Sequence, residues 1–145
     1  MATEIRGLSI RQPWAWAITC AGKTVENRSR PASYRGTLAI HASKTRPLDA
    51  DLGNPLILDA IADQQFEIDK AASVLGAIVA VAELVSCHPH CRASASPDAC
   101  DTVWTPLCSP WAVRSQWHWQ LTNIRPLTEP VPCRGFLLRG EQRNG

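Results

Sequence analysis

The chain has 145 residues, of which 45% are hydrophobic and 19% are charged, and its net charge is only +2. This balance excludes an intrinsically disordered chain and suffices for one sizeable core. The longest unbroken apolar stretch, 77–82, is far shorter than the roughly 20 residues that a membrane-spanning helix requires. We therefore expect a globular protein with no membrane partner.

The charges are distributed unevenly along the chain. Residues 1–46 carry eight Lys and Arg against two acids, a balance of +6. Residues 47–73 carry one Lys against six acids, a balance of −5, and the remainder contributes +1. A basic segment beside an acidic one can direct an anionic ligand to one surface.

The cysteines and the N-terminus indicate a cellular compartment. Six cysteines without a hydrophobic leader segment are typical of reduced thiols in a cytoplasmic protein. No repeat divides the chain, so we expect one domain over 1–145 with its core at about 5–140. An insertion is expected at about 47–73 and a Cys/Pro-rich loop at about 87–110. Nothing in the sequence indicates an oligomeric state.

The first predicted elements are a strand and a helix. Leu8 and Ile10 mark the strand, and Pro13, a residue favoured in the first helical turn, marks the start of the helix. Apolar side chains then recur at helical spacing as far as Ala21, and Gly22 stands where a C-terminal cap belongs.

The remaining elements are mostly strands, recognised by alternating or continuous apolar residues. The acidic segment is the exception, because its apolar residues, among them Leu58 and Ile61, recur at helical spacing from about Pro55 to Ala72. A mainly β domain with helices (α+β), specifically a small barrel with an inserted acidic helix, is favoured over a doubly wound sheet. The predicted strands are 24–28, 36–43, 76–85, 117–121 and 135–139.

The densest polar cluster is GKTVENR, residues 22–28. On a strand, Thr24, Glu26 and Arg28 project from one face about 7 Å apart, and Lys23 lies where the helix turns into the strand. Arg can hold a phosphate or a base edge, and Glu can accept a hydrogen bond from an exocyclic amine. Glu could equally act as a general base and Lys as a nucleophile. The alternative is a solvent-exposed edge strand with a surface ion pair.

Several segments, spanning Leu8 to Gly135, together resemble the ASC homology (ASCH) domain family. The resemblance implies a small barrel similar to the PUA (pseudouridine synthase and archaeosine transglycosylase) domain, with a cleft between the first helix and neighbouring strands. It also implies RNA or DNA binding, and some bacterial members are amidohydrolases of acylated cytidine. Ribonuclease activity has been proposed for another member. The segments are LSIRQPWAWAI, GKTVENRS, YRGTLAIHAS, GAIVAVAELVSC, SPW, WHWQL and PVPCRG.

The predicted partner is therefore RNA or a nucleotide, with DNA as an alternative, and no cofactor is expected. Among the tryptophans, Trp16 and Trp117 are assigned to the core, whereas Trp14 and Trp119 are candidates for stacking on a base. The candidate nucleic-acid-binding residues are Arg11, Gln12, Trp14, Asn27, Arg28, Arg35, His41, Ser43 and Trp119.

A hydrolase acting on modified nucleosides or on RNA is the alternative function. The amidohydrolase branch of the family pairs a Lys with a Thr three residues later and with a distant Glu. Lys23 occupies the Lys position, but Glu26 stands where that branch has Thr. The candidate catalytic residues are Lys23 and Glu26, with Glu83 as the distant carboxylate and His41 as a proton shuttle. A third alternative is a protein-interaction adaptor that uses the Cys/Pro-rich loop.

The Cys/Pro-rich loop raises the question of zinc. Its Cys-x3-Cys spacing and neighbouring His residues are compatible with a tetrahedral site. However, no Cys-x2-Cys pair occurs and His88-Pro89-His90 is cramped, so reduced loop thiols are favoured and no metal is predicted. The thiol and imidazole residues concerned are Cys87, His88, His90, Cys91, Cys100 and Cys108.

Overall fold

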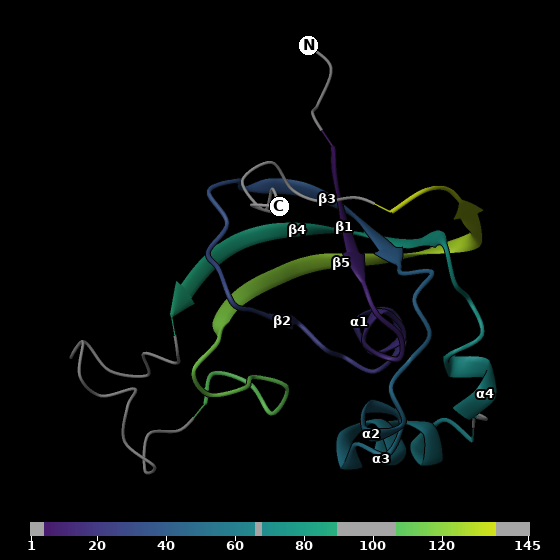
Figure 1. The fold of residues 1–145 in the computed structure, drawn as a ribbon. Coiled ribbons are helices and arrows are strands. Elements are labelled where there is room, and N and C mark those ends of the chain that lie inside the picture. Colours follow the sequence, from purple (N-terminus) through teal and green to yellow (C-terminus); the bar gives the residue numbers. More distant parts are fainter. Residues whose placement is uncertain (1–4, 66–67, 90–106, 136–145) are drawn as a thin grey trace.

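The computed structural model describes residues 5–65, 68–89 and 107–135 of the chain (Figure 1). These residues form a mixed α+β fold in which one sheet carries most of the core. None of the helices in these ranges is long and apolar enough to cross a membrane. In chain order the elements are β1 (Arg6–Ile10), α1 (Trp14–Cys20), β2 (Val25–Arg28), β3 (Gly36–Ala42), α2 (Asp49–Leu52), α3 (Pro55–Asp63), α4 (Ile68–Ala71), β4 (Ala77–Pro89) and β5 (Trp117–Pro132).

The sheet has the strand order β1-β3-β4-β5-β2. β1 runs parallel to β3, and the other neighbouring strands are antiparallel. The two longest strands, β4 and β5, arch across the molecule (Figure 1), and register shifts interrupt their pairing at three places. Such irregularities bend a strand and increase its twist. Within the described residues β1 and β2 are the sheet edges, so closure into a barrel stays a prediction.

The helix predicted after the first strand is present as α1. Its first helical residue is Trp14, and Pro13 occupies the N-cap position. Gly22 follows with a φ of 71°, in the left-handed region that a residue with a Cβ adopts only at a cost. The chain can therefore turn directly from α1 into β2.

Strand β5 is longer than the sequence predicts. Alternation after Leu121 is broken by Asn123 and Pro126, which usually end a strand, yet pairing with β4 continues as far as Pro132. Because β2 pairs only with residues 117–120, no strand among the described residues pairs with the other side of β5 beyond that point. Proline is tolerated on such an edge, since no ladder hydrogen bond is lost.

The strand predicted at 135–139 is not confirmed. Gly135 is outside any strand, and the other residues of the prediction lie outside the described ranges.

The single long helix predicted for the insertion is wrong. α3 ends at Asp63, and Gln65 adopts a positive φ of 51°, which an α-helix does not allow. α4 follows as a separate short helix. The buried face of α3 is formed by Ile57 and Ile61, whereas Leu58 points away from the core.

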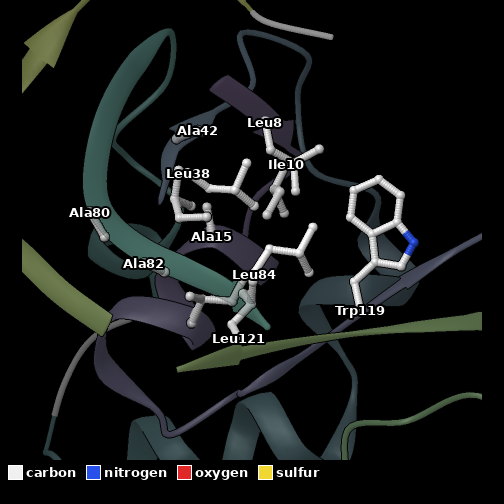
Figure 2. Packing of buried hydrophobic residues seen from close by; sticks show 12 residues of the cluster. Leu8, Ile10, Ala15, Leu38, Ala42, Ala80, Ala82, Leu84, Trp119 and Leu121 are labelled. Atoms are coloured by element: carbon white, nitrogen blue, oxygen red, sulfur yellow. The ribbon is translucent and has the colours of Figure 1, made fainter. Parts of the chain in front are cut away.

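The main core lies between α1 and the concave side of the sheet (Figure 2). Leu8 and Ile10 from β1 meet apolar side chains of β3, β4 and β5 there, and Trp119 closes one side of the cluster. Trp119 is 0% exposed, and its indole N–H donates to the carbonyl of Arg30 at 2.9 Å. Its ring thus has no open face on which a base could stack.

Two leucines test where the core lies. Leu8 is 0% exposed and Leu58 is 46% exposed. We expect Leu8→Ala to lower the free energy of unfolding by about 2–5 kcal/mol, because it leaves a cavity in close-packed surroundings. The same change at Leu58 should cost less than about 1 kcal/mol. Urea unfolding measures both, and equal losses would contradict this assignment.

Candidate functional site

A cavity of about 290 Å³ opens between α1, β2 and the segment that precedes β5. It lies where the polar cluster 22–28 was predicted to form a site. α1 contributes one aromatic wall, and the segment before β5 contributes another. The start of α3 closes a third side. The lining residues are Trp14, Lys23, Glu26, Asn27, Asn54, Leu56, Pro110, Trp111, Ala112 and Val113.

Lys23 is the buried cation of the cavity, with an exposed fraction of 1%. Its Nζ donates to the carbonyl of Val25 at 2.6 Å and lies 3.7 Å from Glu26 Oε2. The same Nζ stands 5.9 Å from the centroid of the Trp14 ring, within the range of a cation–π contact. Burial lowers the pKa of Lys23 below its ordinary value of 10.5; the Glu26 carboxylate opposes this, and the charge of Arg28 adds to it.

Glu26 supplies an acceptor whose hydrogen-bonding capacity is not used. Its Oε1 accepts from its neighbour, the backbone N–H of Asn27, at 3.1 Å. Oε2 is buried and has no hydrogen-bond partner in the described part of the chain, since the Lys23 ammonium is too distant for one. An unsatisfied buried acceptor costs about 1–3 kcal/mol. A ligand that donates a hydrogen bond to Oε2 would recover that free energy.

Asn27 holds the second aromatic wall in place. Its Nδ2 donates to the carbonyl of Trp111 at 2.9 Å, and its Oδ1 accepts from the N–H of Val113 at 2.8 Å. Trp111 then meets Trp14 edge to face, with ring centroids 6.4 Å apart and planes at 86°. Asn27 therefore lines the cavity, but its amide is committed to the protein.

Trp111 was missed by the sequence reasoning. It lies within SPW, a segment that carries the ASCH resemblance, but nothing in its local pattern separates it from a core tryptophan. Its place in the site depends on contacts with β2, which is 84 positions away in the chain.

Other predicted binding residues lie outside this cavity and make structural contacts. Arg28 donates from Nη2 to the carbonyl of Ser9 at 2.7 Å. The amide of Gln12 is buried and joins the N–H of Trp16 to the carbonyl of Val74. Arg35 is exposed and donates to two nearby carbonyls. Arg11 is half-buried beyond the end of β1, and Trp119 belongs to the core.

His41 and Ser43 line a second hollow, of about 600 Å³. His41 Nε2 lies 2.9 Å from the carbonyl of Cys133, which can only accept, so this nitrogen carries the proton. Nδ1 then accepts from the hydroxyl of Ser9 at 2.9 Å. Neither His41 nor Ser43 is a lining residue of the cavity that contains Lys23.

Glu83 also lies away from Lys23. It sits on β4, where both carboxylate oxygens accept from the Thr37 hydroxyl at 3.1 Å and Oε1 pairs with Arg125 at 3.2 Å. These partners line a shallow depression apart from the Lys23 cavity. The structure therefore does not bring Glu83 together with Lys23 and Glu26 as a catalytic set.

The family model of the ASCH domain matches residues 8–130. The chain belongs to the ASCH domain family. No curated protein matches it. The family match covers every residue that lines the Lys23 cavity of this ASCH domain.

The pKa of Lys23 tests the geometry of this ASCH cavity. We expect Lys23 to lose its proton below 10.5, and Glu26→Gln to lower its pKa further, because the carboxylate raises it. The ¹³C NMR signals of the lysine Cε atoms report this titration, and Lys23→Met identifies the signal.

A titration of Lys23 at or above 10.5 would contradict its burial. The same shift makes stability depend on pH. Between the lowered pKa and 10.5 the unfolded chain holds more protons than the folded one, so the contribution of Lys23 to stability rises with pH. This rise of stability with pH should be absent in the Lys23→Met variant.

Proposed function

We propose that this ASCH domain binds RNA or a nucleotide by taking one base into the cavity that Trp14 and Trp111 line. The observation that carries the proposal is Glu26 Oε2, a buried acceptor at the cavity with no hydrogen-bond partner among the described residues. An exocyclic amine of a base is a donor of the right kind for a carboxylate.

The walls of the cavity suit an unstacked base. Single-stranded nucleic acids are commonly recognised by stacking their bases on aromatic side chains. Trp14 and Trp111 offer two such surfaces at right angles, and both line the cavity together with Lys23. A base lying on one ring would meet the other ring at about a right angle.

The size of the cavity limits what can enter. Ligand pockets commonly measure about 300–1,000 Å³, and this one, at about 290 Å³, is at the small end. It suits one nucleobase or nucleoside rather than a paired stem. A longer RNA would therefore present a single base here, while its phosphates remain outside.

The fold supports this proposal in a more general way. We infer that the curved sheet is of the small PUA-like barrel type and that 1–145 is a single ASCH domain. β1 to β5 share one sheet, and the family match covers 8–130. Cytoplasmic location remains a prediction from the cysteines.

Cytidine and uridine provide the sharpest test. They have similar shapes, but cytidine presents an amine where uridine presents a carbonyl oxygen. We expect cytidine to bind about tenfold or more tightly than uridine, because one such contact discriminates by about 1–3 kcal/mol. Isothermal titration calorimetry with both nucleosides and with short C-rich and U-rich RNAs measures the ratio.

Three variants serve this test. Glu26→Gln should abolish the preference for cytidine, since an amide can pair with either base. Trp111→Ala should weaken the binding of both nucleosides, because it removes one of the two aromatic walls. Glu83→Gln is the matched control, because its carboxylate is engaged with Thr37 and Arg125 away from the cavity. Equal affinity for the two nucleosides, or none for either, would refute the proposal.

A hydrolase of acylated cytidine is the second candidate. The observation that favours it is the buried Lys23 with its lowered pKa, since lysines of this kind serve as nucleophiles and bases. Water would cleave the amide of N4-acetylcytidine into cytidine and acetate.

If this chain is such an enzyme, it releases cytidine from N4-acetylcytidine in a chromatographic assay, and Lys23→Met reduces the rate by at least about 100-fold. Glu83→Gln should retain the rate, since Glu83 lies away from Lys23. No release by the native chain would leave binding as its function.

A further inference from the structure

Three side chains with metal-ligating atoms meet beyond the cavity, where β4 ends and β5 begins. They are His88 of β4, His118 of β5 and Cys108 of the segment before β5, and their ligand atoms all lie within 4.8 Å of one another. His88 and His118 are directly opposite partners in the β4–β5 ladder. Their rings stand edge to face, with centroids 5.4 Å apart.

The sulfur and the buried imidazole are spaced like two ligands of one metal ion. Cys108 Sγ lies 3.7 Å from His118 Nδ1. Bonds of about 2.3 Å from zinc to sulfur and about 2.0–2.1 Å to nitrogen, at a tetrahedral angle, place the two atoms about 3.5–3.6 Å apart. Little movement of either side chain is needed to admit the ion.

The imidazole of His118 is oriented for this role by its other nitrogen. Nε2 lies 2.6 Å from the carbonyl of Val113, which can only accept, so Nε2 carries the proton. The lone pair of the neutral ring is then on Nδ1, the nitrogen that faces Cys108. Metal-binding histidines usually donate their second N–H to a carbonyl or carboxylate in this way, which fixes the ring.

We propose that His88, Cys108 and His118 bind a zinc-class metal ion. One thiolate and two imidazoles are ligands that zinc prefers, and three protein ligands leave one tetrahedral position for water or another donor. His118 is 0% exposed while Cys108 is exposed, so the site has a rigid inner ligand and an outer one that solvent metal can reach. The thiol loses its proton when the metal binds.

The metal would fasten the segment that forms part of the cavity. Cys108 and His118 lie on either side of Trp111 and Val113 in the chain, and Asn27 holds those two residues against β2. The ion would thus link the two ends of the segment 108–118, whose middle Asn27 already holds against β2. This argument concerns metal binding alone and does not depend on a nucleotide ligand.

Cobalt absorption spectroscopy tests the proposal on the full chain. Protein stripped of metal under reducing conditions is titrated with Co²⁺, which reports thiolate ligation by a charge-transfer band and tetrahedral geometry by its visible spectrum. We expect saturation at one Co²⁺ per chain and displacement by an equimolar amount of Zn²⁺. Zinc should also raise the midpoint of thermal unfolding.

Matched variants assign the ligands. Cys108→Ser and His88→Gln should each weaken Zn²⁺ binding at least tenfold, and Cys108→Ser should lose the charge-transfer band. Cys20→Ser, which removes an exposed thiol on α1, should leave both unchanged. Because His118 is buried and His118→Gln could unfold the chain, the two more exposed ligands carry the test. Absence of saturable binding, or a Cys108→Ser spectrum equal to that of the native chain, would overturn the proposal.

Discussion

The side-chain amide of Asn27 is the contact on which the cavity lined by Lys23 depends. Its two hydrogen bonds reach the backbone at Trp111 and Val113 and hold the segment before β5 against β2. One consequence is the second wall of the cavity. The other is the position of the Val113 carbonyl, which orients His118. An amide can serve both purposes because it donates and accepts in one plane.

The buried Lys23–Glu26 pair costs free energy of folding. Removing an ammonium and a carboxylate from water is expensive, and attraction between them repays it only when their remaining atoms are also satisfied. Here the Lys23 ammonium donates to a carbonyl at 2.6 Å, but one oxygen of Glu26 accepts no hydrogen bond from the described part of the chain. The unsatisfied acceptor makes this pair costly for stability, and the proposed base would offset that cost by donating to it.

Residues associated with the ASCH resemblance have three physical roles in this chain. Trp14, Lys23 and Glu26 face the cavity and could contact a ligand. A second group, represented by Gln12 and Arg28, ties loops and strands together through hydrogen bonds to backbone carbonyls. The third role belongs to Trp119, which fills the core. Membership of a family motif therefore does not by itself place a residue at the cavity.

The sequence by itself determined the local features of this protein. Helical spacing after Pro13, a glycine at position 22 and the polar run that follows place a helix, a tight turn and a strand in order. This succession brings Lys23 and Glu26 together, since they are only three positions apart. The acidic helix was located but its end was not, because Gln65 carries no signal for the positive φ that separates α3 from α4.

Only the tertiary structure decided which distant residues complete each site. Trp111 joins Trp14, and His118 joins His88 and Cys108, because strand pairing and the Asn27 amide bring them together. The tertiary structure also decided that Glu83 lies away from Lys23, because the β3–β4 ladder places that carboxylate beside Thr37. Spacing along a chain reports neighbours within an element, whereas contacts between elements depend on register and burial throughout the sheet.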